Sequence, residues 1–567
     1  MPDIVPDASN EQRDPAGGSA EPAAGPEAGP SGLGGLGGPP PRAFATTVPD
    51  TCISIVMTLA LAFVFRAFVL EAFVIPTGSM APTLLGAHYR IESPSTGAVF
   101  AVDRRAADTS QQATVRDPYS GVRLSFDGSA RLDGDRIFVR KRTPLTPLPE
   151  RFDVVVFRSP TEPDERVIKR LIGRPGEQIA LVDGDVFVRS ADGTEPGRSF
   201  TWHEQGWQVQ RKPAAVQRLV WQPVYDMAFA DPRSETSLGP WTPMTAGWPA
   251  GTGPRVSYAG DGPTALVWDR EQWEIRDRLA YNDIDDRRDQ RLGSGGSRGG
   301  LPPNYHVSDL RLRFGYEVAA GAAAGATWTL ETRSRVFELS VADSGEGTTA
   351  RIRVRVAGGE TWAQLAEAPV ELAPRGPTLI EFEHVDQACV IRVGGREAAR
   401  AEYDWTIRQR IERAIPGAEL SAMTDLSDEA NPLSDPDQYQ PPSLRLDLAG
   451  PATLHRLRLD RDVYYHPHHP RYRVSDEPPP LGTHPITTVT LGPGQLFVLG
   501  DNSPASRDGR TWGRPDPWVA DAFPSTATEG VVPEQLLIGE AFLVYFPAMH
   551  RRGLIPVPDF GRMRLIR

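Results

Sequence analysis

The sequence predicts a mainly β protein with one membrane-spanning helix, a β-rich domain that is discontinuous in sequence, and an inserted β-sandwich. Three observations indicate this fold class. An apolar stretch of membrane length occupies residues 50–75, short alternating or apolar runs flank a long middle region, and that region contains further alternating runs between Gly-rich turns. At 567 residues the chain is long enough for several domains.

The N-terminal part divides into a tail and an anchor. Residues 1–49 are rich in Pro, Gly, Ala and acidic residues, so they cannot bury enough apolar surface to offset their ordering entropy, and we expect a disordered tail. Residues 50–75 are dominated by Ile, Val, Leu and Phe, and the charges of Arg66 and Glu71 both lie near one end. Because a basic n-region and a small-residue cleavage site are not evident, we predict an uncleaved single-pass transmembrane anchor.

Strand patterns follow the anchor and return near the C-terminus. Alternating or continuous apolar runs bounded by Gly and Pro are typical of strands. These runs cover residues 136–141, 153–158, 178–182, 186–188, 496–499 and 541–546. We expect residues 76–202 and 481–567 to form the two parts of one domain.

The middle region, residues 203–480, is large enough for a core of its own. Its alternating strands predict a sandwich, and the hairpin ending at residues 391–397 resembles concanavalin-like jelly rolls. Its first part concentrates tryptophan at Trp202, Trp207, Trp221, Trp241, Trp248, Trp268 and Trp273. These rings could stack on sugars, but tryptophan is highly buried on average, so we favour a packing role.

Two short segments carry candidate chemistry. Residues 75–84 (IPTGSMAPTL) follow the apolar stretch directly and present Ser79, and residues 167–177 (VIKRLIGRPGE) present Lys169. A serine and a lysine can serve as nucleophile and general base in amide hydrolysis.

Lysine is scarce in this chain, which makes Lys169 informative. The only lysines are Lys141, Lys169 and Lys212, and nearly every other basic position is arginine. A general base is a place where arginine cannot substitute, because a guanidinium does not deprotonate in proteins whereas a desolvated ammonium can. Lys169 therefore has a predicted role as base, and Lys212 is interpreted as a surface lysine.

The two segments, together with residues 499–513 (LGDNSPASRDGRTWG), resemble the three signature boxes of bacterial type I signal peptidases. They occur in the order of that family, behind a transmembrane helix. The resemblance covers roughly residues 50–200 and 480–567 and leaves out the long middle region. Residues 503–504 depart from the charged residues that many members carry there.

The resemblance implies a membrane-bound serine endopeptidase that removes signal peptides from exported preproteins by a Ser-Lys dyad. Ser79 would be the nucleophile and Lys169 the base, and the Thr77 hydroxyl would join the Ser79 N–H as oxyanion donor. Ser506 would lie beside the lysine ammonium. The remaining supporting positions fall on Asp501, Asp508 and Arg510.

Partners and location follow mainly from the resemblance. We expect signal peptides and membrane lipid as partners, and a glycan or envelope ligand is considered for the inserted domain. The family implies a single-pass protein of the cytoplasmic membrane with its catalytic domain on the outer side. The net charge of −12 argues against a nucleic-acid partner. Neither a metal nor an organic cofactor is expected, and Cys52 and Cys389 offer no disulfide framework.

Two Pro-Gly turns leave an alternative open. Residues 93–97 and 117–121 look like a pair of zinc knuckles whose cysteines are missing, or they are unrelated turns. Without a thiolate, a structural zinc is not supported.

Two other functions fit the sequence less well. A sandwich that binds envelope material on an inactive peptidase scaffold is disfavoured because every expected catalytic residue is present, and a self-cleaving regulator would have no anchor. All the expected hydrolytic groups lie outside residues 205–478, so we predict that replacing those residues with a short linker preserves cleavage.

Overall fold

The structure is a computed structural model. It describes residues 48–103, 112–127, 131–143, 146–191, 202–231, 238–249, 253–282, 284–285, 304–418, 420, 432–467, 479–552 and 555–566. The chain divides into two units, Met1–Leu61 and Ala62–Arg567. The predicted disordered tail lies outside the described residues up to residue 47, and residues 48–49 already belong to the first helix.

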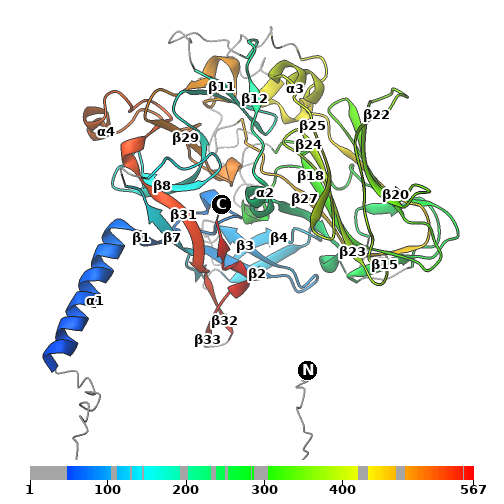
Figure 1. The fold of residues 1–567 in the computed structure, drawn as a ribbon, viewed down its shortest axis with the longest axis horizontal. Helices are drawn as coiled ribbons and strands as arrows, with labels where there is room; N and C mark the ends of the chain where they lie inside the picture. Colours follow the sequence, from blue (N-terminus) through cyan, green and yellow to red (C-terminus); the bar gives the residue numbers. More distant parts are fainter. Residues whose placement is uncertain are drawn as a thin grey trace, which may run out of the picture. The chain divides into compact units, whose positions relative to one another are not determined.

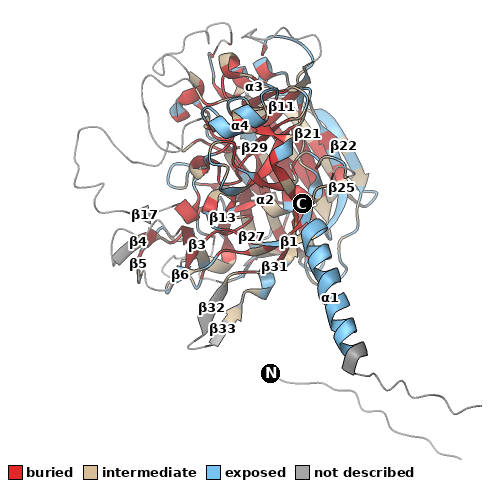
Figure 2. Cartoon of the chain, turned by 90° about the vertical axis from the view of Figure 1, so that its left-hand side faces the viewer, coloured by how far each residue is buried: buried red, intermediate tan, exposed pale blue. Residues whose placement is uncertain are grey.

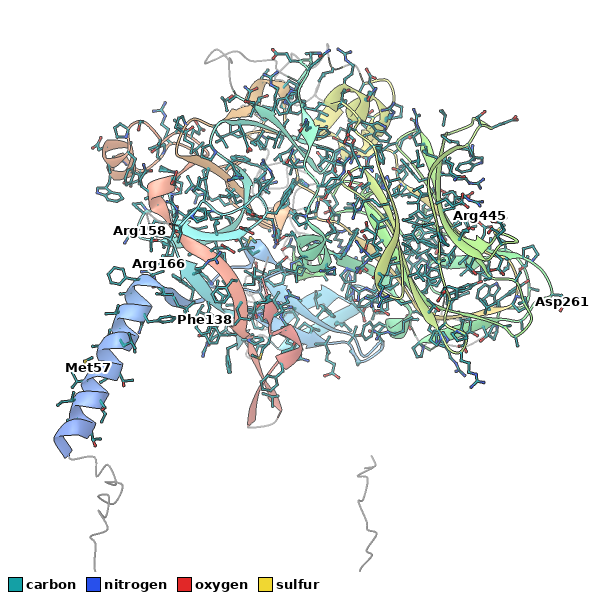
Figure 3. All side chains as sticks on the ribbon, in the orientation of Figure 1. Met57, Phe138, Arg158, Arg166, Asp261 and Arg445 are labelled. Carbon is teal, nitrogen blue, oxygen red and sulfur yellow. The ribbon has the colours of Figure 1, made fainter. Side chains whose placement is uncertain are left out.

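The N-terminal helix α1 spans Val48–Phe68. An 18-residue window of it has a mean hydropathy of 2.0 and none of that window is buried within the protein (Figure 2). The helix ends before residue 75, the predicted end of the anchor, because Leu70–Val74 form strand β1. Glu71 on that strand pairs with Lys141 and with Arg166, which Figure 3 labels, at 2.9 Å each.

The first sheet joins strands from both ends of the chain. Its order is β1-β7-β31-β8-β9-β29-β30, and β34 pairs with β31. The new strands are β7 (Arg136–Lys141), β8 (Val154–Arg158), β9 (Arg166–Gly173), β29 (Gln495–Leu499), β30 (Val532–Pro533), β31 (Leu537–Phe546) and β34 (Arg564–Leu565). Figure 1 shows β31, in red, beside β7 and β8, in cyan. The β-rich domain is therefore discontinuous, as predicted.

Smaller sheets surround it. One has the order β12-β11-β10-β28, two have three strands, in the orders β3-β2-β6 and β17-β4-β5, and one is the hairpin β32-β33. Their strands are β2 (His88–Glu92), β3 (Val99–Asp103), β4 (Gln112–Arg116), β5 (Arg123–Asp127), β6 (Arg131–Leu132), β10 (Glu177–Val182), β11 (Asp185–Ser190), β12 (Gln208–Val209), β17 (Ile284–Asp285), β28 (Val489–Thr490), β32 (Met549–Arg552) and β33 (Ile555–Pro558). Strand β17 comes from the middle region, so this region adds a strand to a sheet built from residues 112–127.

The two Pro-Gly turns between these strands contact each other. The Thr96 hydroxyl of the first turn donates to the Asp117 carboxylate of the second at 2.7 Å. Asp117 also accepts from the backbone N–H groups of Tyr119 and Ser120. A side-chain hydrogen bond thus joins the two turns, and Asp117 also accepts bonds within its own turn.

The middle region forms a sandwich of two antiparallel sheets, which lie face to face in Figure 1. One has the order β13-β27-β18-β23-β24-β25 with β15 paired to β27, and the other has the order β14-β16-β26-β19-β20-β21-β22. The first comprises β13 (Gln222–Asp226), β15 (Arg255–Tyr258), β18 (Leu310–Val318), β23 (Thr378–Val385), β24 (Ala388–Val393), β25 (Arg396–Glu402) and β27 (Ala452–Arg461). The second comprises β14 (Trp241–Pro243), β16 (Thr264–Trp268), β19 (Gly325–Thr332), β20 (Arg335–Asp343), β21 (Thr348–Val356), β22 (Ala363–Pro369) and β26 (Ser443–Leu448). Alternate residues such as Leu312 and Phe314 on β18, and Trp328 and Leu330 on β19, fill one shared core.

Within the described part of the chain, the helices other than α1 are few and short. The α-helices are α2 (Ala214–Val220), α3 (Ile407–Ala414) and α4 (Pro517–Ala522). The 3₁₀ turns are η1 (Gly78–Met80), η3 (Met227–Phe229), η4 (Ala280–Asn282), η7 (Pro432–Ser434), η8 (Pro436–Gln438), η9 (Pro485–Thr487), η10 (Ser503–Ala505), η11 (Glu534–Leu536) and η12 (Phe560–Arg562). Helix α3 begins with a capping box, in which the side chains of Thr406 and Gln409 each accept from the backbone N–H of the other.

The tryptophans of the middle region serve packing. Trp202, Trp221, Trp241 and Trp268 are buried. The others, Trp207, Trp248 and Trp273, are half-buried and pack against the hydrophobic clusters. The preferred interpretation is confirmed, and these rings give no support to sugar stacking.

Candidate active site

The turn that carries Ser79 is held from both sides. Ile75 before it and Met80 within it are both buried, in a cluster that includes Ile168 of β9. These two side chains fix η1 against the first sheet and leave Ser79 half-buried between them. Thr77, which precedes η1, has an extended backbone and an exposed side chain that makes no hydrogen bond to the backbone of η1.

Lys169 lies on β9, opposite Val155 of β8, and β9 contacts η1 directly. Only 2% of the residue is exposed. This desolvation lowers the pKa of Lys169 from 10.5 to about 8. The charge of Asp508 raises this pKa, that of Arg510 lowers it, and that of Asp501 raises it.

The two carboxylates that act on Lys169 are each paired with an arginine. Asp508 accepts from Arg510 Nε at 2.9 Å and Nη2 at 2.8 Å, and from the Gly500 N–H at 2.9 Å. Burial by itself would raise the pKa of Asp508, but Arg510 and these hydrogen bonds hold it below its ordinary value. Asp508 therefore stays ionised, but its charge is already paired with Arg510. It stabilises the protonated form of Lys169 less than an unpaired carboxylate would.

Asp501 is matched in the same way by Arg170, the neighbour of Lys169 on β9. Arg170 donates through Nε at 2.7 Å and Nη2 at 2.5 Å to the two carboxylate oxygens, and both side chains are fully buried. Its Nη1 donates to the Phe152 carbonyl at 2.7 Å. Arg170 is not among the predicted site residues. Its position beside the proposed base, within the same box, was the available signal.

Gly500 is the point where the Ser79 turn and the third segment, residues 499–513, meet. A Cβ at this position would lie 2.2 Å from the Ser506 Oγ and 2.5 Å from the Ser79 carbonyl oxygen. Ser506 is fully buried, and its hydroxyl has no hydrogen-bond partner among the described residues. The structure thus brings Ser506 next to the Ser79 turn, and its place beside the Lys169 ammonium stays a prediction.

Residues of the middle region also reach this turn, which sequence analysis did not foresee. Asn502 donates through its backbone N–H to the Ser79 carbonyl at 3.0 Å and through Nδ2 to the Gly78 carbonyl at 2.9 Å. Asn282 of η4 exchanges hydrogen bonds with the Asn502 side chain, and Tyr281 packs on Gly78. Removing residues 205–478 would therefore remove Tyr281, which packs on the Ser79 turn, and Asn282, which supports that turn through Asn502, so the structure argues against the expectation that hydrolysis is independent of this region.

Lys212 is not a surface lysine, and that interpretation was wrong. Its side chain is 4% exposed and pairs with Asp386 at 2.6 Å and Asp462 at 2.8 Å. Burial would lower the pKa of Lys212, but these two carboxylates hold it well above its ordinary value. A lysine held protonated in this way cannot act as a base at neutral pH.

One buried group of carboxylates has the spacing of a metal site, away from the Ser79 turn. Its members are Asp185, Asp309 and Asp386. Each has a cation beside it: Arg410 lies 3.1 Å from Asp185, Arg333 lies 2.9 Å from Asp309, and Lys212 pairs with Asp386. Because these cations already balance the charge, we interpret the group as an ion-pair network.

Comparisons with known proteins agree with this arrangement. The family model "Signal peptidase, peptidase S26" matches residues 49–217 and 461–546. The signal peptidase I of Rickettsia typhi is 33% identical over 153 residues, which cover 27% of this chain and 48% of the relative. The signal peptidase I of Rickettsia bellii (strain OSU 85-389) is 32% identical over 135 residues, which cover 24% of this chain and 37% of that relative. The chain thus matches about half the length of these relatives or less.

Solved structures show weaker similarity. The carbohydrate binding module CBM66 from Bacillus subtilis has a TM-score of 0.21 at 10% identity and covers 39% of this chain and 95% of its own. The Caenorhabditis elegans galectin LEC-6 has a TM-score of 0.17 at 13% identity, and the match covers 30% of this chain and 99% of the galectin. TM-scores this low do not identify a shared fold. The family match, by contrast, includes all three boxes around the Ser79 turn, and the two segments that match the signal peptidase family S26 are separated by residues 218–460.

Proposed function

We propose that the protein is a membrane-bound serine endopeptidase that removes signal peptides from exported preproteins, with Ser79 as nucleophile and Lys169 as general base. The observation that carries this proposal is the burial of Lys169, which lowers its pKa to about 8. Lys169 also lies on β9, the strand that contacts the Ser79 turn. The similarity to signal peptidase I of Rickettsia supports the substrate class.

The pKa of Lys169 makes the chemistry feasible at neutral pH. An ordinary lysine is neutral in roughly one molecule in 2,500 at pH 7, whereas a pKa of about 8 makes roughly a tenth neutral. The neutral amine takes the Ser79 hydroxyl proton as Oγ attacks the scissile carbonyl carbon. The resulting ammonium returns a proton to the leaving amine, which departs with the C–N bond broken and leaves an ester on Ser79. Water, deprotonated by Lys169, then hydrolyses that ester.

The oxyanion of each tetrahedral intermediate needs hydrogen-bond donors. The proposed donors are the Ser79 N–H and the Thr77 hydroxyl, which lies just before η1 on an exposed side chain. Asp501, Asp508 and Arg510 set the charge around Lys169 as positioning groups.

Cleavage of a purified preprotein in detergent or proteoliposomes tests the proposal. We expect cleavage by the wild type and none by Ser79→Ala. Ser257→Ala, on the exposed surface of strand β15 in the sandwich, is the matched control and should cleave at the wild-type rate. Cleavage by Ser79→Ala at the wild-type rate would refute the role of Ser79.

The proposed topology is a single anchor with the catalytic part outside the cytoplasmic membrane. Helix α1 is long and apolar enough to span. Protease added to intact spheroplasts should digest the chain beyond about residue 76, and protection of that part would reverse the orientation. Residues 76–202 and 481–567 remain the proposed bounds of the catalytic domain, and residues 203–480 those of the insertion.

A further inference from the structure

We propose that Asn282, contributed by the middle region, is a positioning residue that orients the oxyanion donor of Ser79. This inference rests on the proposed function and extends it to a region outside the three boxes. It follows from a chain of hydrogen bonds that runs from Asn282 through Asn502 to the peptide group between Gly78 and Ser79.

The direction of the Asn502 amide is the first step. Asn282 Nδ2 donates to Asn502 Oδ1 at 2.6 Å, and Asn502 Nδ2 donates to Asn282 Oδ1 at 2.9 Å. The second hydrogen of Asn502 Nδ2 goes to the Gly78 carbonyl at 2.9 Å. If the Asn502 amide were flipped, its NH₂ group would face the Asn282 NH₂ group and its oxygen would face the Asn282 oxygen. Its oxygen would also point toward the Gly78 carbonyl oxygen. Asn282 thus selects the orientation in which Asn502 donates to Gly78.

The peptide group between Gly78 and Ser79 is the second step. Its carbonyl accepts from Asn502 Nδ2 and from the Ala81 N–H at 3.0 Å. In a trans peptide the N–H points opposite to the C=O. Fixing the Gly78 carbonyl on the protein side therefore aims the Ser79 N–H away from Asn502. That N–H is the donor proposed for the oxyanion.

The segment that carries Asn282 is anchored on both sides, so it can act as a rigid support. On the N-terminal side of Asn282, the Asp277 N–H donates to the Tyr305 carbonyl at 2.9 Å. The Asp277 carboxylate accepts from the Tyr305 N–H at 2.7 Å. After Asn282, Ile284 pairs with Val115 in the β17·β4 ladder. Asn282 itself is 5% exposed. Its amide is held in place by structure on each side.

Tyr281 adds a steric contact at the same turn. A Cβ on Gly78 would lie 2.2 Å from a ring carbon of Tyr281 and 2.5 Å from its hydroxyl oxygen. The ring therefore packs on the backbone of Gly78 itself. Two consecutive residues of the middle region thus hold the peptide group that precedes the nucleophile, one by hydrogen bonding through Asn502 and one by packing.

The test is a double-mutant cycle on preprotein cleavage with Asn282→Ala, Asn502→Ala and the double variant. We expect Asn282→Ala to lower kcat by about 100-fold with little change in KM, because misplacing a reacting group by about 1 Å has an effect of this size. In the Asn502→Ala background the same substitution should have no further effect. The pH dependence should keep its midpoint, because Lys169 is untouched. The isosteric Asn282→Asp cannot donate to Asn502 and should also lose kcat.

The matched control is Gln217→Ala, which removes an equally buried amide, 5% exposed, that donates to Asp462 and does not contact the turn. We expect it to keep wild-type kcat. A wild-type kcat for folded Asn282→Ala, an additive loss in the Asn502→Ala background, or an equal loss in Gln217→Ala would overturn the inference.

A second measurement separates this inference from the proposed function. Hydrogen exchange followed by mass spectrometry reports the order of residues 76–84 whether or not the protein cleaves anything. Exchange in this segment should rise in Asn282→Ala and stay unchanged in Gln217→Ala, and unchanged exchange in Asn282→Ala would count against the inference. Absence of preprotein cleavage by the wild type would instead contradict the proposed function alone.

Discussion

Replacing Lys169 by Met should make the protein more stable at neutral pH while abolishing cleavage. Burial lowers the pKa of Lys169 from 10.5 to about 8. One pKa unit corresponds to about 1.4 kcal/mol, so keeping this lysine protonated in the folded protein costs about 3 kcal/mol. Met has a similar length and carries no charge, so the substitution removes this cost.

The stability difference between Lys169→Met and the wild type should depend on pH. Below about pH 8 the lysine is protonated in both the folded and the unfolded chain, and the full cost applies. Between about pH 8 and 10.5 the unfolded chain binds the proton and the folded protein does not, so the wild type gains stability as pH rises. The advantage of Lys169→Met should therefore be about 3 kcal/mol at pH 7 and should vanish toward pH 10.5.

Urea unfolding in detergent, followed by tryptophan fluorescence at pH 7 and pH 10, measures this difference. Lys212→Met is the matched control, because the Lys212 side chain is also buried, at 4% exposed, but is paired with Asp386 and Asp462. Its removal leaves two buried carboxylates without their cation and should destabilise the protein at pH 7 by about 3–5 kcal/mol. A Lys169→Met variant no more stable than the wild type at pH 7, or with the same advantage at both pH values, would refute the reasoning.

The remaining predictions concern turnover and its pH dependence. Lys169→Arg should abolish preprotein cleavage, because a guanidinium stays protonated, and normal turnover would exclude Lys169 as base. In the wild type, kcat/KM should rise with pH through a midpoint of about 8 as Lys169 loses its proton. Asp508→Asn removes a charge that raises this pKa, so the midpoint should move to lower pH, and an upward move would contradict the assigned sign. Gly500→Ala should lose activity in a folded protein, because its Cβ would lie 2.2 Å from the Ser506 Oγ and 2.5 Å from the Ser79 carbonyl oxygen, and wild-type kcat would contradict this packing.

Local patterns accounted for much of the fold. The predicted strand at residues 136–141 coincides with β7, and that at 153–158 nearly coincides with β8. The hairpin predicted at residues 178–188 is β10 and β11. These predictions succeed because side chains alternate between the two faces of a strand, and that period of two is visible in any short segment. The end of the anchor was placed too late because residues 70–74 are as apolar as the helix before them, and only pairing with β7 makes them a strand.

The resemblance to the signal peptidase family S26, the two-part β-rich domain and the candidate pair of Ser79 and Lys169 can all be read from the sequence, because three boxes in order and a rare lysine are properties of the chain alone. The tertiary structure decided what surrounds that pair. The burial that lowers the pKa of Lys169 and the amide of Asn282 behind the Ser79 turn depend on residues far apart in sequence. No local pattern encodes such contacts, because a desolvating wall or a reciprocal amide pair exists only after distant segments have packed together.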